Sequence, residues 1–211
     1  MKISKISIFK KMGNKTEFHN SFMVLNQSLG FEKMEFQSFS FGTYDECKDL
    51  FIAAFKFCDK TVTDFVWKGK YHDVIQWMAD TKGTGLFITG DVGLGKSNIV
   101  GKVIPLLFLE KHNKIVHFAH ANALGKNKEQ LLTKKFLTID DIGVEAFHNE
   151  YGVKSIPLKE LVENAERKCN TLFISTNLNK HEMLERYDER TLDRIRRLCT
   201  LVKLKGPSLR K

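Results

Sequence analysis

The sequence predicts an α/β fold in which a parallel sheet carries helices on both faces. Short apolar segments of strand length alternate with amphipathic segments of helical length through residues 71–204. Such alternation is typical of parallel sheets whose crossovers are helices. A glycine-rich segment, GDVGLGKS at residues 90–97, joins the first apolar segment to a helical one. The length of 211 residues suits one domain with a short appendage.

A helix is predicted at residues 44–58. Thr43 and Glu46 have the spacing of a capping box, and apolar side chains follow at helical intervals as far as Cys58. This helix either docks a partner or packs on its own domain, and packing is the favoured interpretation. Residues 1 to about 35 contain no motif that predicts a structure.

The remaining elements follow from apolar runs and helical periodicity. We expect strands at residues 85–89, 115–119, 136–139, 171–175 and 200–204, and helices at 71–78, 98–104, 124–133, 156–168 and 191–198. Pro105 is expected to kink or end the helix that follows the glycine-rich segment, because proline lacks the backbone N–H.

The glycine-rich segment matches G-x-x-x-x-G-K-[ST], the phosphate-binding loop of nucleoside triphosphatases. Its glycines let backbone N–H groups turn toward the phosphates, Lys96 reaches the β- and γ-phosphates, and the Ser97 hydroxyl ligates Mg²⁺. The helix that follows presents an N-terminus that favours anions. The predicted nucleotide-binding residues are therefore Gly90, Asp91, Val92, Gly93, Leu94, Gly95, Lys96 and Ser97.

Polar side chains follow two later strands. Asp140 and Asp141 close the strand at residues 136–139, which is the Walker B arrangement: Asp140 lies beside Mg²⁺, and Asp141 orients or deprotonates the attacking water. Asn177 follows the strand at residues 171–175 and can position water against the γ-phosphate. Each of these residues is also common in turns. Downstream of a phosphate-binding loop, the catalytic interpretation of the two aspartates is favoured.

Composition narrows the class of protein. The formal net charge of +9 has two interpretations that charge alone leaves about even: a polyanionic partner, or a soluble surface that is merely rich in lysine. The four cysteines are scattered without a C-x-x-C pair, which argues against a zinc site of usual spacing and for reduced thiols. No apolar run has the length of a membrane span, and no secretory signal is visible, so we expect a cytoplasmic protein without a membrane partner.

These segments together resemble the AAA+ ATPases of the DnaC helicase-loader and IstB transposition-helper group. The resemblance covers roughly residue 36 to the C-terminus. It is carried by Gly90–Ser97, FLTIDDIGV at 136–144, STNLN at 175–179, ERTLDR at 189–194 and LKGPSLRK at 204–211. The first two motifs occur in many ATPases, whereas the last two, in this order after STN, are much more specific.

The resemblance implies a three-layer α/β/α P-loop NTPase fold with strand order 5-1-4-3-2, and an AAA+ core at residues 61–211 without a helical lid. Residues 1–60 would be an N-terminal extension containing the amphipathic helix. Asn177 would be the sensor-1 residue. Arg194 would be an arginine finger that acts on the ATP of a neighbouring subunit, and Arg210 would be a sensor-2-like arginine.

The function that the resemblance implies is the binding and hydrolysis of ATP with Mg²⁺ by a homo-oligomer that loads a replicative helicase onto single-stranded DNA. A phage or mobile-element source fits the compact chain. An IstB-like regulator of a transposase is the alternative, which LKGPSLRK favours somewhat. Many AAA+ proteins have Asp-Glu where this chain has Asp140-Asp141, so slow hydrolysis, or an ATP-binding scaffold, is a third possibility.

Overall fold

A computed structural model of the protein describes residues 35–61, 71–145, 148–150, 153–206 and 208. The expectations for residues 1–34 and for Arg210 lie outside these residues. Phe36–Lys211 form one compact unit. Its described elements are α3 (Tyr44–Cys58), α4 (His72–Ala79), β1 (Gly85–Gly90), α5 (Lys96–Asn98), η1 (Ile99–Val103), α6 (Ile104–His112), β2 (His117–His120), η2 (Ala121–Ala123), α7 (Leu124–Leu131), β3 (Phe136–Ile142), β4 (His148–Glu150), β5 (Val153–Ser155), α8 (Pro157–Lys168), β6 (Thr171–Thr176), α9 (Lys180–Arg186), α10 (Glu189–Leu198) and β7 (Cys199–Leu204).

The central sheet consists of five parallel strands in the order β2-β3-β6-β1-β7. Numbered in chain order among themselves, these strands read 2-3-4-1-5, which confirms the predicted order when the sheet is read from its other edge. In the register of the sheet, Leu86 of β1 pairs with Phe173 on one side and Thr200 on the other. Because all five strands run the same way, the segments that follow β1, β3 and β6 meet at one edge of the sheet.

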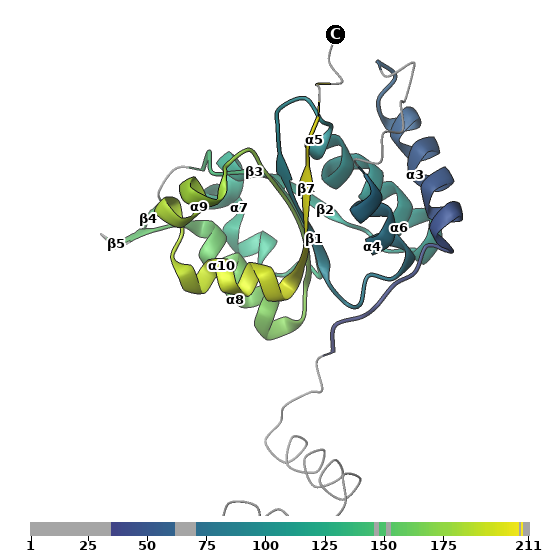
Figure 1. Cartoon of the computed structure of the whole chain (residues 1–211). Helices are drawn as coiled ribbons and strands as arrows, with labels where there is room; N and C mark the ends of the chain where they lie inside the picture. The colour runs from purple at the N-terminus through teal and green to yellow at the C-terminus, as the bar shows by residue number, and fades with distance from the viewer. Residues whose placement is uncertain (1–34, 62–70, 146–147, 151–152, 207, 209–211) are drawn as a thin grey trace, which may run out of the picture. The chain divides into compact units, whose positions relative to one another are not determined.

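Helices cover both faces of this sheet (Figure 1). On one face α3, α4 and α6 enclose a core that includes Leu86 and Ile88 of β1. On the other face α7, α8 and α10 pack over Phe87 of the same strand and Ile174 of β6. Successive side chains of a strand point to opposite faces, so a strand covered on both faces is apolar throughout. This explains the uninterrupted apolar run of β1.

Helix α3 packs on its own domain, as favoured from the sequence. Its Phe51 and Phe55 side chains are fully buried in the core that contains Leu86 and Ile88. The helix begins as expected, because the Glu46 side chain accepts a 2.7 Å hydrogen bond from the Thr43 backbone N–H in a complete capping box. Within the described residues, no helix combines the length and the apolar character needed to cross a membrane.

The helical segment after the glycine-rich loop continues past Pro105. It runs from α5 through the π-helical turn η1 into α6, and Pro105 lies in the first turn of α6. A π turn shifts the hydrogen-bond pattern by one residue, which lets the chain accommodate a residue without an N–H. The Thr138 hydroxyl of β3 donates a 2.7 Å hydrogen bond to the Val100 carbonyl inside this turn. The expectation that Pro105 ends the helix is therefore wrong.

Candidate functional site

The glycine-rich loop leaves β1 and turns directly into α5. Gly93 and Gly95 have φ angles of +82° and +81°, in the left-handed region that favours glycine. At Gly93 a Cβ atom would also lie 2.2 Å from the Ser208 hydroxyl oxygen, so the segment after β7 lies against the loop. Directly before α4, the buried Tyr71 hydroxyl donates a 3.1 Å hydrogen bond to the Leu94 carbonyl. The loop is thus supported by two segments distant from it in the sequence.

Lys96 is buried against the loop that precedes it. Its ammonium donates hydrogen bonds of 2.7 Å and 2.8 Å to the carbonyl oxygens of Gly90 and Asp91. Burial lowers the pKa of Lys96, and the charges of Asp141, Asp91 and Asp140 oppose this shift. The lysine side chain therefore lies between the loop and the two aspartates of β3, where a bound phosphate would compensate its charge.

Ser175 organises both aspartates at the end of β3. Its hydroxyl donates a 2.5 Å hydrogen bond to Asp140 Oδ1 and accepts a 2.9 Å hydrogen bond from the Asp141 backbone N–H. Ser175 and Asp140 are both buried. The sequence marked this position only as part of the S-T-N strand end, so the hydrogen bond of Ser175 to the carboxylate that is predicted to lie beside Mg²⁺ was missed.

Asp141 adopts a left-handed backbone conformation. Its φ angle is +60°, and the pairing of β3 with β6 shifts register between Ile139 and Ile142. A non-glycine residue in the left-handed region destabilises the fold by on the order of 1 kcal/mol. Such residues are concentrated at functional sites. The bulge sets Asp141 where Asn177 Nδ2 donates a 2.7 Å hydrogen bond to its Oδ1. The structure therefore brings together two residues that were predicted to act on the same water.

The residues present fit a nucleoside triphosphate with Mg²⁺. A lysine, a loop of backbone N–H groups, a hydroxyl and an oriented carboxylate are the groups that bind phosphate and Mg²⁺ in P-loop proteins.

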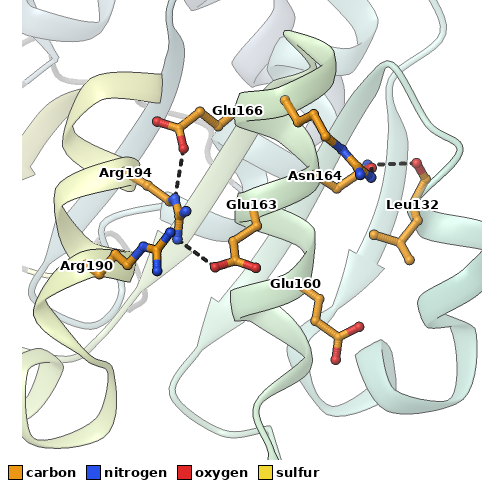
Figure 2. A pocket seen from close by; sticks show the side chains of 8 residues that line it. Leu132, Glu160, Glu163, Asn164, Glu166, Arg190 and Arg194 are labelled. Carbon is orange, nitrogen blue, oxygen red and sulfur yellow. Dashed lines mark hydrogen bonds and ion pairs between the residues drawn. The ribbon is translucent and has the colours of Figure 1, made fainter.

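Of the two arginines predicted to act on the nucleotide, the structure describes Arg194 but not Arg210. Arg194 lies on α10, on the sheet face opposite to α3, α4 and α6, and its guanidinium is held between Glu163 and Glu166 of α8 (Figure 2). Its predicted action on a neighbour's ATP stays a prediction. Arg210 lies outside the described residues, although Ser208 nearby contacts Gly93 of the loop.

The loop after β3 is tied to the corner between α9 and α10. Glu145, which is buried, accepts a hydrogen bond from the Gly143 backbone N–H at 2.7 Å. The other oxygen of its carboxylate accepts a hydrogen bond from the Tyr187 hydroxyl, and its backbone carbonyl accepts one from Arg186. The segment that follows the two aspartates is thereby joined to the start of α10. No pattern in the sequence indicated this connection.

Replacement of Ser175 by alanine should reduce ATP hydrolysis about 10- to 100-fold, the usual effect of losing a group that orients a metal ligand. The physical reason is that Asp140 and the Asp141 N–H would both lose their partner. Turnover at saturating ATP is the measurement. Thr200→Ala is the control, because the Thr200 hydroxyl of β7 pairs with Thr84, directly before β1, and not with the aspartates. Equal turnover of Ser175→Ala and wild type would contradict the assigned role.

The comparisons with solved structures concern the fold. A putative primosome component from Streptococcus pyogenes is 16% identical, with a TM-score of 0.53 over 74% of this chain and 90% of that one. AMPPCP-bound DnaA from Aquifex aeolicus is 14% identical, with a TM-score of 0.52 over 71% of this chain and 51% of that one. A DnaC helicase loader gives 18% identity and a TM-score of 0.48 over 58% of this chain and 78% of that one.

No protein-family model matches the sequence, and no curated protein matches it either. At these identities a structural similarity shows the fold alone. The chain shares the α/β P-loop fold of these two structures, the putative primosome component and DnaA, with the strand order given above.

Proposed function

We propose that the protein is a DnaC-like ATPase, which couples the binding and hydrolysis of ATP to the loading of a replicative helicase onto single-stranded DNA. The observation that carries the ATPase part is the arrangement of Lys96, Asp140 and Asp141, with Ser175 and Asn177 hydrogen-bonded to the aspartates. The replication part is supported by the resemblance of the sequence motifs and by the shared fold with a putative primosome component and with DnaA.

In this proposal each residue of the site has one task. The loop amides and Lys96 bind the β- and γ-phosphates, and Ser97 with Asp140 would hold Mg²⁺, which neutralises charge on the phosphates. Asp141 accepts a proton from the attacking water, or orients it, while Asn177 holds the Asp141 carboxylate in place. Hydrolysis is expected to be slow, because an Asp reaches one methylene less far toward the water than a Glu.

The surface that meets DNA is expected to be basic, given the net charge of +9. Two of the lysines are engaged by other parts of the fold. Lys128 is buried and forms a 3.0 Å ion pair with Glu160, and the Lys135 ammonium donates to the Cys169 carbonyl. Lys203 in β7 and Lys205 directly after it are exposed, and they are candidates for contacts with DNA phosphates.

The test is ATP-dependent association of the full-length protein with the replicative helicase of its host and with labelled single-stranded DNA. We expect a complex that forms with ATP, weakens as salt rises and is absent with Lys96→Ala. If the wild-type protein shows no ATP-dependent association with helicase or single strands, the proposal fails. Preference for duplex DNA together with stimulation of a transposase would support the IstB-like alternative instead.

A further inference from the structure

The π-helical turn η1 leaves one buried carbonyl without a backbone donor. The Ile104 N–H, which an α-helix would direct to the Val100 carbonyl, bonds instead to the Ile99 carbonyl. The next donor of a π turn would be the N–H of residue 105, which is a proline and has none. Val100 is fully buried, so its carbonyl needs a hydrogen-bond partner from another part of the fold.

A threonine of the neighbouring strand supplies that partner. The hydroxyl of Thr138, which is fully buried in β3, donates a 2.7 Å hydrogen bond to the Val100 carbonyl. The rest of the strand before Asp140 is apolar, in the sequence FLTI at 136–139. Burying a hydroxyl is unfavourable unless it is hydrogen-bonded. The Thr138 hydroxyl therefore has a specific task, because it takes the place of the N–H that Pro105 lacks.

The hydrogen bond lies next to the residues that are predicted to hold Mg²⁺. The helical segment begins with Lys96, on which the charge of Asp140 acts. It reaches Thr138 at Val100, so it runs along β3 in the opposite direction. Ser97 precedes Val100 by three residues, about 4.5 Å of helix. Thr138 and Asp140 are two residues apart, about 6.6 Å of strand, and their side chains point to the same face of the sheet. The hydrogen bond therefore also fixes how Ser97 faces Asp140.

A glycine brings the helical segment close to the sheet at the same level. Phe118 of β2 pairs with Thr138 in the register of the sheet. A Cβ atom on Gly101 would lie 2.9 Å from the Phe118 ring, which is closer than side chains normally approach. Gly101 directly follows Val100, so this close contact adjoins the hydrogen bond. Two neighbouring contacts with adjacent strands thus define the position of the helical segment on the sheet.

We propose that Thr138 is a positioning residue of the nucleotide site. Its hydroxyl holds the helical segment at a fixed position along β3, which sets the distance between the Ser97 hydroxyl and the Asp140 carboxylate. The inference rests on the proposed function, because it assumes that these two groups would hold one Mg²⁺ ion with ATP. Ser97 and Asp140 belong to different elements, whereas the loop amides and Lys96 belong to one continuous segment. Loss of the Thr138 hydroxyl should therefore affect Mg²⁺ more than the nucleotide itself.

The first arm of the test is Thr138→Val in the full-length protein, because valine has the shape of threonine without the hydroxyl. The probe is a fluorescent, non-hydrolysable ATP analogue, whose affinity is measured at increasing Mg²⁺ concentration. We expect the Mg²⁺ concentration that half-saturates the tightening of binding to rise about tenfold or more, the usual effect of disturbing a group that supports a metal ligand. The affinity for the same analogue in EDTA should match that of wild type.

Two further variants separate this role from a loss of stability. Thr138→Ser keeps the hydroxyl but loses a buried methyl group, so it should lower the unfolding midpoint and leave the Mg²⁺ dependence as in wild type. Thr81→Val is the matched control, because the buried Thr81 hydroxyl accepts a 2.8 Å hydrogen bond from the Phe39 N–H in a segment that precedes β1. It should also lower only the midpoint. If folded Thr138→Val has the Mg²⁺ dependence of wild type, the positioning role is overturned.

The second arm is the double variant Thr138→Val with Pro105→Ala. Alanine gives position 105 a backbone N–H, one π turn after Val100. The decrease of the unfolding midpoint caused by Thr138→Val should therefore be smaller in the Pro105→Ala background than in the wild-type background. The Mg²⁺ dependence should stay weakened, because a backbone N–H satisfies the carbonyl without joining the helical segment to β3. This variant also carries the Mg²⁺ measurement if Thr138→Val alone does not fold. An equal decrease of the midpoint in both backgrounds, or a recovered Mg²⁺ dependence, would overturn the inference.

The wild-type measurement separates this inference from the proposed function. If Mg²⁺ tightens binding of the analogue equally in wild type and in Thr138→Val, only the role of Thr138 falls. If the wild type does not bind the analogue, or binds it without regard to Mg²⁺, the ATPase proposal and the role of Thr138 fall together. A weakened Mg²⁺ dependence in Thr138→Val, with no binding of helicase by the wild type, supports the positioning role and removes only the helicase part of the proposal.

Discussion

Replacing Lys96 with alanine is expected to weaken ATP binding by at least about 100-fold, the effect of losing charged hydrogen bonds to two phosphates. The Lys96 ammonium lies between the loop carbonyls of Gly90 and Asp91 and the charges of Asp140 and Asp141. No other side chain of the loop GDVGLGKS carries a positive charge. Titration with a fluorescent ATP analogue measures the loss directly.

The same variant should stay close to wild type in stability in the absence of nucleotide. Alanine removes a buried ammonium, whose pKa burial lowers, but it also removes the hydrogen bonds of Lys96 to the Gly90 and Asp91 carbonyls, so the two effects oppose each other. ATP should raise the unfolding midpoint of the wild type and leave that of Lys96→Ala unchanged. The control is Lys102→Ala, an exposed lysine farther along the same helical segment. Full ATP-induced stabilisation of Lys96→Ala would contradict the assigned role of this loop.

Asp141→Asn is expected to lower ATP hydrolysis about 10²- to 10⁴-fold, the range attributed to a general base, while ATP binding is retained. Asparagine keeps an oxygen that can accept the Asn177 hydrogen bond, and it tolerates the φ angle of +60° at this position. The fold and the loop should therefore remain intact, and only the capacity to accept a proton is lost. Single-turnover hydrolysis and ATP affinity, measured on the same preparation, separate the two steps.

The matched control for this variant is Asp49→Asn, an exposed acid on α3 far from the nucleotide loop in the sequence. It should hydrolyse ATP at the wild-type rate. Unchanged turnover of Asp141→Asn would show that another group activates the water. A wild-type protein that binds ATP tightly but releases no phosphate would instead identify an ATP-binding scaffold, which the Asp140-Asp141 pair leaves open.

The glycine-rich loop and the buried strands were predictable because their signals are local, whereas the strand order was implied only by the resemblance to a known family. The spacing of Gly90, Gly95 and Lys96 within eight residues specifies the loop, and each buried strand is an apolar run that ends in turn-forming or acidic residues. The end of β3 was harder to place. The apolar run stops at Ile139, yet the strand continues through a bulge to Ile142, because hydrogen bonds with β6 resume beyond Asp141.

By itself, the sequence determined that a loop with the spacing of a phosphate-binding motif follows a buried strand, that two aspartates end another strand, and that arginines crowd one later helix. Only the tertiary structure decided that Ser175 joins Asp140 to Asp141 and that Arg194 is paired while Arg190 is exposed. The physical reason is the range of the interactions. Loop and strand patterns depend on neighbouring residues, whereas the partner of a side chain depends on which distant segment the fold brings within hydrogen-bonding distance.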